Sequence, residues 1–152
     1  MSNDLDRELE KLEKVSFLII DDDEDIVDVM NDVISSNIHS NSILAYNGLD
    51  GYHEAQLREF DFIVTDFQLP SLNGIEFIRQ VRTRKGPNQD TPIILLSGYQ
   101  PELDPKDHFW ENVFFLEKPL TSSKLLFNIK CCMRLKKMKG ETLEKVGGPG
   151  ET

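Results

Sequence analysis

Short apolar runs alternate with helix-like segments along most of the chain. Four of these runs are rich in β-branched and aromatic residues and contain few polar ones, which is typical of strands buried on both faces. They are VSFLII (Val15 to Ile20), FIVT (Phe62 to Thr65), PIILLS (Pro92 to Ser97) and VFFLE (Val113 to Glu117). A weaker fifth run, SILAY (Ser42 to Tyr46), is expected to form an outer strand.

Helical spacing of apolar residues fills the intervals between these runs. It predicts helices over 26–34 and 75–81, and the stretch 49–57 is compatible with a short helix. Two prolines restrict any helix over 101–110 to a late, short one, because proline disrupts a helix interior. With a last helix after the fifth run, the order is β-α-β-α-β-α-β-α-β-α. This order predicts a doubly wound α/β fold, with helices on both faces of a five-stranded parallel sheet.

The main domain is expected to span residues 15–139. Thr121 is a suitable N-cap for its last helix, and Gly140 is the expected stop. Residues 140–152 are glycine-rich and polar, so we expect a disordered tail there.

Residues 1–14 form an acidic amphipathic arm. Its leucines, Leu5, Leu9 and Leu12, recur at helical spacing. A stripe that narrow is marginal as an isolated helix, so we expect the arm to pack on its own domain or on a second copy.

Composition narrows the class of protein. The 152 residues include 17 basic and 27 acidic ones, a net charge of −10, which argues against direct nucleic-acid binding. No apolar run approaches the ~20 residues of a membrane span, and no secretory signal is visible, so no membrane association is expected. The two cysteines, Cys131 and Cys132, are adjacent, which favours a cytoplasmic protein.

Chemically informative residues stand where the predicted strands end. Asp21 and Asp22 follow the first run, and Asp66 follows the run at 62–65. Ser97 ends the next run, and Lys118 follows the last. Because the carboxyl ends of parallel strands share one edge of a sheet, we expect these side chains to meet.

Three carboxylates in one pocket repel one another unless a cation is present. Oxygen ligands with open positions suit Mg²⁺, which takes few protein carboxylates and keeps several waters. Magnesium beside a carboxylate, a hydroxyl and a lysine is the equipment of phosphoryl transfer.

Four sequence blocks resemble the receiver domain of bacterial two-component response regulators. They are LIIDDDEDI (Leu18 to Ile26), VTDFQLPSLNG (Val64 to Gly74), LLSGY (Leu95 to Tyr99) and LEKP (Leu116 to Pro119). The resemblance covers about residues 15–139 and implies a flavodoxin-like, CheY-like (βα)5 sandwich with strand order 2-1-3-4-5.

The resemblance also implies roles for individual residues. Asp66 would be the phospho-acceptor and a ligand of Mg²⁺, with Lys118 as its ionic partner. Asp22 would bind the metal directly, Asp21 through water, and Gln68 through its backbone carbonyl.

A conformational switch is implied as well. Ser97 would hydrogen-bond the phosphoryl group, and Phe115 would turn inward as that hydroxyl moves. The face formed by the fourth helix, fifth strand and fifth helix would then be remodelled. The bond between Lys118 and Pro119 would be cis.

The leading hypothesis is a stand-alone response-regulator receiver rather than an enzyme, one that catalyses only its own phosphorylation and dephosphorylation. A sensor histidine kinase or a histidine phosphotransfer protein would supply the phosphoryl group. Output would pass through an unknown partner protein or through homodimerisation.

Two alternatives remain open at this point. One is a phosphatase of the haloacid-dehalogenase type with Asp21 as nucleophile, although the hydroxyl residue expected after its Asp-x-Asp is missing. The other is a receiver fold that serves only as a binding module and is never phosphorylated.

Overall fold

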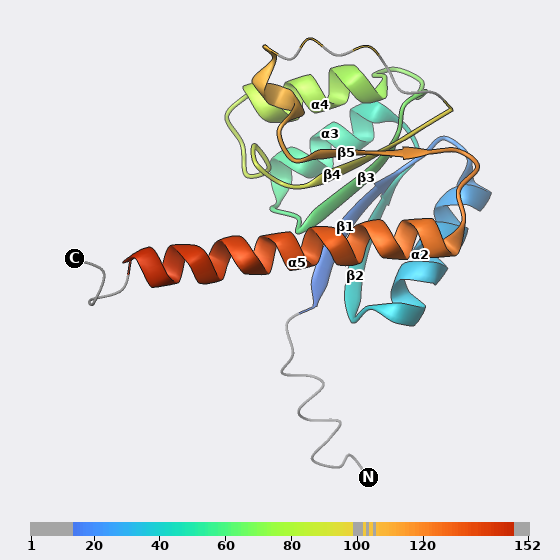
Figure 1. Ribbon diagram of the computed structural model, residues 1–152. Coiled ribbons are helices and arrows are strands. Elements are labelled where there is room, and N and C mark those ends of the chain that lie inside the picture. The colour runs from blue at the N-terminus through green and yellow to red at the C-terminus, as the bar shows by residue number, and fades with distance from the viewer. Residues whose placement is uncertain (1–13, 99–101, 103, 105, 148–152) are drawn as a thin grey trace.

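A single parallel sheet organises the molecule (Figure 1). The computed structural model describes residues 14–98, 102, 104 and 106–147, with side chains described up to residue 135. The strands are β1 (Val15–Ile20), β2 (Ser40–Ala45), β3 (Phe62–Asp66), β4 (Ile93–Ser97) and β5 (Val113–Glu117). The helices are α2 (Glu24–Asn37), α3 (Gly48–Leu57), α4 (Gly74–Thr83), the short 3-10 helix η1 (His108–Trp110) and α5 (Ser122–Gly147).

The strand order is β2-β1-β3-β4-β5, which confirms the predicted order 2-1-3-4-5. All pairings are parallel: Ile20 pairs with Thr65, Asp66 with Leu96, and Ser97 with Glu117. This register aligns the carboxyl ends of the central strands at one edge of the sheet.

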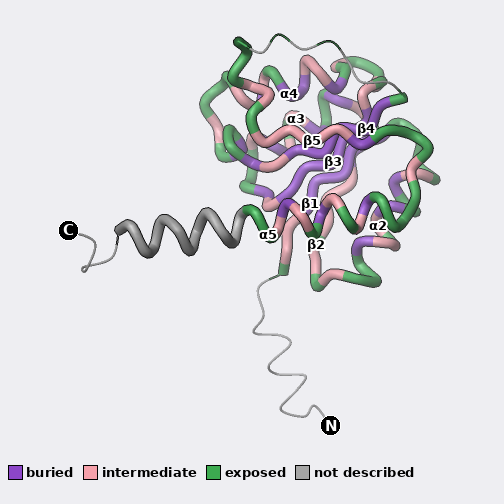
Figure 2. The backbone as a smooth tube through the Cα atoms, viewed as in Figure 1, coloured by how far each residue is buried: buried purple, intermediate pink, exposed green. Residues whose placement is uncertain are grey.

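Two hydrophobic cores lie on the two faces of the sheet. One is closed by α2 and α5 and includes Met30 and Ile129, while the other is closed by α3 and α4 and includes Phe77. Every residue of β3 and of β4 is buried, as Figure 2 shows for the centre of the sheet. Burial on both faces is the reason why these runs are continuously apolar.

Four helices begin with a side-chain cap. Asp23, Asn47, Asn73 and Thr121 each accept a hydrogen bond from a backbone N–H in the first turn of α2, α3, α4 and α5, which confirms Thr121 as the predicted N-cap of the last helix. Each such cap contributes about 1 kcal/mol to stability.

The crossover between β4 and β5 differs from the other crossovers. Its described residues contain only η1, so the late, short helix expected there is confirmed as a single 3-10 turn. The full α-helix that the alternating order required at this position is therefore not found among the described residues, which hold four α-helices. The two prolines of the sequence explain the difference, because each removes a backbone donor.

The predicted end of the last helix at Gly140 is wrong. Helix α5 continues to Gly147, so residues 140–147 are helical rather than part of a disordered tail. One glycine costs a helix interior only about 1 kcal/mol relative to alanine, and ETLEKV after Gly140 contains good helix formers. Residues 148–152 and the arm up to residue 13 lie outside the described residues.

Arg82 ties loops together at the sheet edge where the strands begin. Its guanidinium donates to the backbone carbonyls of Asn88 at 3.1 Å, Thr91 at 2.7 Å, Glu111 at 3.1 Å and Asn112 at 3.4 Å. Burial lowers the pKa of Arg82 to about 10, which still leaves it charged at neutral pH. The side chain thereby links α4 to the loops that precede β4 and β5.

Asn88 makes a second connection at the same edge. Its amide accepts from the backbone N–H of Phe60 at 2.8 Å and donates to the carbonyls of Ala55 at 2.6 Å and Arg58 at 2.8 Å. A single buried side chain thus joins the end of α3 to the start of β3. No helix within the described part of the chain is long and apolar enough to cross a lipid bilayer.

Candidate functional site

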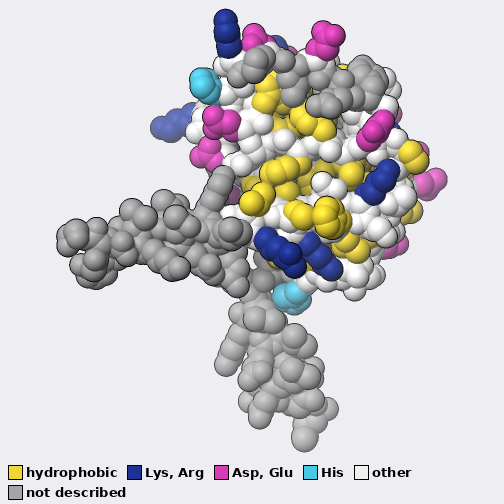
Figure 3. Space-filling view, in the orientation of Figure 1, with side chains coloured by type: hydrophobic (Ala, Val, Ile, Leu, Met, Phe, Trp, Pro, Cys, Tyr) yellow, Lys and Arg dark blue, Asp and Glu magenta, His cyan; other side chains and the backbone are white. Residues whose placement is uncertain are grey.

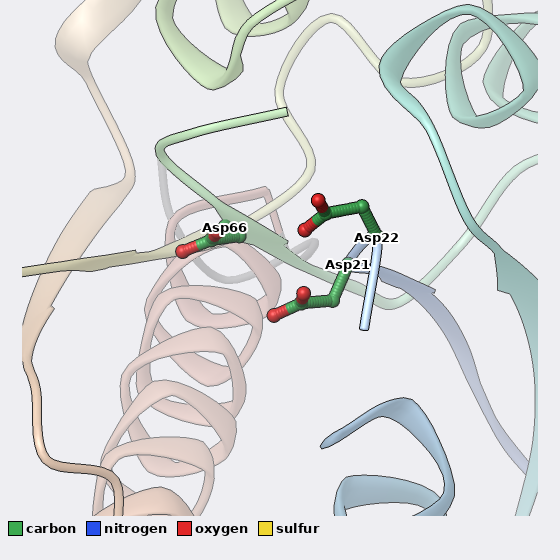
Figure 4. Close-up of side chains that lie close together, drawn as sticks. All are labelled: Asp21, Asp22 and Asp66. Carbon is green, nitrogen blue, oxygen red and sulfur yellow. The ribbon is translucent and has the colours of Figure 1, made fainter. Parts of the chain in front are cut away.

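Three carboxylates gather at the edge where the strands end (Figure 4). Asp21 and Asp22 directly follow β1, and Asp66 is the last residue of β3. Oxygen atoms of the three side chains lie within 4.8 Å of one another. Asp21 and Asp66 are buried and Asp22 is exposed, so the cluster is open to solvent on one side. The adjacency of β1 and β3 in the sheet creates this group, although 44 residues separate Asp22 from Asp66.

The carboxylate of Asp21 is only half satisfied. Its Oδ1 accepts the backbone N–H of Asp23 at 2.9 Å, whereas its Oδ2 is buried with no hydrogen bond from any described residue. Burial, aided by the charge of Asp66, raises the pKa of Asp21 to about 6. Both features indicate a missing positive charge.

The donor set fits a hard divalent cation. It consists of carboxylate oxygens only, one of them a buried oxygen without a hydrogen bond, beside an exposed acid that leaves room for water. Three acids this close would each be stabilised by a cation between them. The residues present therefore suit Mg²⁺, as the sequence predicted.

Lys118 contributes the opposite charge. It follows β5, and its Nζ lies 2.7 Å from Oδ1 of Asp66. Its backbone N–H donates to the carbonyl of Ser97 at 2.8 Å, which fixes the start of the Lys118 loop against the end of β4. The bond from Lys118 to Pro119 is cis, as the resemblance implied.

The other predicted site residues take the following places. Ser97 is buried at the end of β4, the strand beside β3. Gln68 is exposed in the loop after β3, two residues beyond Asp66. The structure thus brings four predicted residues within a few ångströms of one another: Asp21, Asp22, Asp66 and Lys118. Ser97 and Gln68 lie at the same edge of the sheet.

The loop after Asp66 depends on a glycine that the sequence reasoning did not single out. The N–H of Gly74 donates to the carbonyl of Phe67 at 2.9 Å, which closes the loop onto the end of β3. A Cβ at this position would lie 2.5 Å from the carbonyl oxygen of Asp66, far inside contact distance. Only glycine allows α4 to approach Asp66 this closely. The signal was present as the last residue of VTDFQLPSLNG.

Gly48 supports the same loop from α3. A Cβ there would lie 1.8 Å from the carbonyl oxygen of Leu72. Within the loop, Ser71 adopts a positive φ of 71°, a left-handed conformation that is uncommon for residues other than glycine.

An aromatic cluster occupies the place beside β5 where a helix was expected. The ring of Phe115 lies 5.8 Å from Trp110, whose ring lies 4.7 Å from Phe109. The guanidinium of Arg79 in α4 sits 5.5 Å from the Phe109 ring. The indole N–H of Trp110 is buried and has no hydrogen bond from any described residue. Phe115, expected to act as a switch, is half-buried and already packed against Trp110.

A largely apolar groove of about 370 Å³ opens beside the carboxylates. Asp21 and Lys118 line it together with Ile26, Val29, Leu120 and other residues. Val29 is 58% exposed, although it is a large apolar residue. The groove joins the charged cluster to an apolar surface of α2.

Comparisons with known proteins agree with this geometry. Residues 17–130 match the family described as the response regulator receiver domain. The transcriptional regulatory protein CusR of Escherichia coli K12 is 32% identical over 99 residues, which cover 60% of this chain and 39% of CusR. The response regulator ArlR of Staphylococcus aureus Mu50 is 32% identical over 92 residues, 59% of this chain and 39% of ArlR. The chain thus matches about two fifths of the length of these relatives.

Solved structures share the fold. The chemotaxis response regulator CheY4 of Vibrio cholerae has a TM-score of 0.67 at 23% identity, covering 79% of this chain and 99% of CheY4. The receiver domain of the sensor histidine kinase PA1611 from Pseudomonas aeruginosa PAO1 has a TM-score of 0.65 at 22% identity, covering 80% of this chain and 97% of that one. Its structure holds a magnesium ion coordinated in the active site cleft.

The phosphatase alternative gains no support from these comparisons. Its proposed nucleophile, Asp21, accepts a backbone hydrogen bond on Oδ1, and the lysine of the site lies against Asp66 instead. Because the family match over residues 17–130 covers all five strands except the first two residues of β1, and the acids lie at the carboxyl edge of the sheet, the chain belongs to the response regulator receiver domain family.

Proposed function

We propose that Asp66 accepts a phosphoryl group from a phosphohistidine in a sensor histidine kinase or a histidine phosphotransfer protein. The observation that carries this proposal is the environment of its carboxylate. Asp66 lies 2.7 Å from an ammonium and shares a cluster with two further acids. An isolated surface aspartate has neither neighbour.

Asp22 and Asp66 are the side chains proposed to hold Mg²⁺ directly, with Asp21 acting through water and Gln68 through its backbone carbonyl. When bound, the cation supplies positive charge that offsets the negative charge of the phosphoryl oxygens. Support comes from the clustered oxygens and from the orphaned Oδ2 of Asp21.

The transfer uses residues of this chain at each end. An oxygen of the Asp66 carboxylate attacks phosphorus, an O–P bond forms, and the P–N bond to the donor imidazole breaks. The electron pair of that bond stays on the imidazole nitrogen, and no proton is needed from Asp66. Lys118 offsets the negative charge of the reacting oxygens.

Ser97 and Phe115 are proposed to transmit the change. The phosphoryl group brings about −1.5 to −2 charges and new acceptor oxygens to the sheet edge, in exchange for the single negative charge of the Asp66 carboxylate. Ser97, at the end of the neighbouring strand, would donate to one of these oxygens. The backbone carbonyl of Ser97 also accepts a hydrogen bond from the backbone N–H of Lys118, so a movement of either residue displaces the other.

The apolar groove next to Lys118 is the proposed contact surface for the phosphodonor. Val29 and Ile26 present apolar area within the same groove as Asp21. A donor helix that covers this groove would bring its phosphohistidine to the acids while excluding water.

Intact mass measurement after incubation with acetyl phosphate and Mg²⁺ tests the proposal. Wild type should gain one phosphoryl group, whereas Asp66→Asn should gain none. Asp32→Asn, an exposed change in α2, serves as the matched control and should label like wild type. Equal labelling of Asp66→Asn, or labelling that is lost only with Asp21→Asn, would refute the assignment of Asp66.

A further inference from the structure

Helix α5 exposes an apolar strip to solvent. The side chains of Phe127 and Leu135 are 69% and 47% exposed, while Leu125 and Ile129 of the same helix are buried. Cys131 lies between the two exposed residues at a spacing of four and is half-buried. We call Phe127, Cys131 and Leu135 the outer strip of α5. Large apolar side chains exposed two turns apart on the same side of one helix indicate a contact surface.

The positive charge beside the outer strip favours a partner with acidic residues. Lys130 and Arg134 are exposed beside the strip. Between Ser122 and Leu135, α5 carries three basic residues and no acidic one. Figure 3 shows hydrophobic and basic side chains next to one another on the described part of the surface above α5. A partner that fits this surface combines an apolar stripe with acidic flanks.

Residues 2–13 of the chain have this composition. They contain five acidic and two basic residues, and Leu5, Leu9 and Leu12 fall on one side of a helix. In that helix, Asp6 flanks the leucines on one side and Glu8 on the other, while Arg7 points away from them.

We propose that residues 2–12 form an amphipathic helix that docks on the outer strip of α5 in the same chain. The spacings agree: Leu5 to Leu12 rises about 10 Å, and Phe127 to Leu135 about 12 Å. Docking covers apolar area that is otherwise exposed and places acidic residues against Lys130 and Arg134.

The described start of the chain lies close enough for this contact. Val15 begins β1 and packs on the same core cluster as Ile129 and Met133 of α5. From Leu12 to Val15 the extended chain spans about 10 Å, comparable with the diameter of a helix. The arm therefore reaches the outer strip without a longer linker.

Dimerisation of two chains through their outer strips is less favourable than docking of the arm. Two α5 helices facing each other would bring their basic residues together, because both present Lys130 and Arg134 beside the strip. Like charges at close range oppose association. The acidic arm removes this conflict.

Disulfide trapping in the full chain tests the docking. Leu9→Cys should form a disulfide with Cys131 under mild oxidation, in a monomer, with the pair identified by peptide mapping. Cys132 competes weakly, because burial raises the pKa of its thiol to about 11. Arg7→Cys, on the opposite side of the arm, is the matched control and should stay reduced. The same disulfide yield in both variants, no disulfide in either, or a linked dimer would overturn the proposal.

A charge reversal supplies a second readout. Combining Lys130→Glu and Arg134→Glu with Leu9→Cys should lower the disulfide yield several-fold at low salt, while Lys85→Glu, exposed elsewhere, should leave it unchanged. An unchanged disulfide yield in the double reversal would contradict the proposed pairing of the acidic arm with Lys130 and Arg134. None of these variants alters the acid cluster, so the result is independent of phosphorylation.

Discussion

Asp21 shows how one residue can be unfavourable for stability and favourable for function. Its carboxylate is 2% exposed, close to Asp66, and has one oxygen without a hydrogen bond from the described residues. Charging it in this place costs free energy, which is why its pKa is raised. The same cost makes the site receptive to a cation.

A pH dependence of stability follows for the metal-free protein. The pKa of Asp21 is about 6 in the folded state against 3.8 as its ordinary value, so the folded state binds the extra proton between these values. The contribution of Asp21 to stability is therefore present below about pH 4 and is lost as pH rises through 6. We expect Asp21→Asn to gain on the order of 2 kcal/mol over wild type between pH 4 and 7.

Chemical denaturation in a chelator at several pH values measures this difference. Adding millimolar Mg²⁺ at pH 7 should shrink the gap, because the cation stabilises the charged wild-type cluster and not the variant. A gap that stays constant with pH would contradict the role given to Asp21.

Arg82 provides a second test at this scale. Arg82→Met keeps the aliphatic stem but leaves four carbonyls without their donor. We expect a loss of about 2–4 kcal/mol in the free energy of unfolding. Arg79→Met removes an exposed pair with Glu76 and should change stability by less than about 1 kcal/mol. Equal losses in urea denaturation would mean that the carbonyl contacts of Arg82 contribute little.

The elements meet most tightly where α4 joins the end of β3. Gly74 places the first turn of α4 against the backbone of Asp66, and the register with β4 fixes the other side. A change at Gly74 thus acts on the site through the backbone rather than through a side chain.

Gly74→Ala should both destabilise the protein and slow phosphorylation. The added Cβ would meet the Asp66 carbonyl at 2.5 Å, so the loop must shift, and we expect a loss of about 1–3 kcal/mol. Gly98→Ala is the matched control for stability, since a Cβ there meets nothing within 4 Å. Thermal unfolding and acetyl phosphate labelling measure the two effects, and normal labelling of Gly74→Ala would count against this backbone coupling.

The strands were predicted better than the helix ends, because a continuous apolar run has one structural explanation whereas a glycine in a helix has two. The continuous apolar runs at β3 and β4 could be recognised because both faces of these strands are buried. The end of α5 was mispredicted at Gly140, because glycine ends a helix or is tolerated within it according to context. The run of SILAY was placed two residues late, since β2 begins with the polar pair Ser40 and Asn41.

The sequence predicted which residues form the site, but not the contacts that hold the surrounding loops in place. Strand ends indicated which side chains meet, and the resemblance assigned them roles. The sequence could not reveal that Arg82 and Asn88 connect loops, because their partners are backbone atoms far along the chain. Nor could it show that Phe115 packs against Trp110 within a crossover lacking a described α-helix.

For the whole molecule, the acid cluster and the aromatic cluster are joined through the edge formed by β4 and β5. The backbone N–H of Lys118, just after β5, donates a hydrogen bond to the carbonyl of Ser97 at the end of β4, and Phe115 lies within β5. Trp110 is the only tryptophan of the chain, so its fluorescence reports on one place.

We expect beryllofluoride with Mg²⁺ to change the emission of Trp110 in wild type. The reason is that a phosphoryl-like group drawing in Ser97 would shift the neighbouring end of β5 and its aromatic contact. Asp66→Asn should give no change, and Phe115→Leu should alter the size of the response because the ring contact is lost. An unresponsive wild type at saturating ligand would refute coupling between the two clusters.

The direction of α5 has a practical consequence. This helix starts at the carboxyl edge of the sheet and runs past the opposite edge, where β1 also begins (Figure 1). A fluorophore, an affinity handle or a sensor surface joined to residue 147, the last described residue of α5, would therefore lie far from Asp66. Immobilised protein should remain as open to a phosphodonor as protein free in solution.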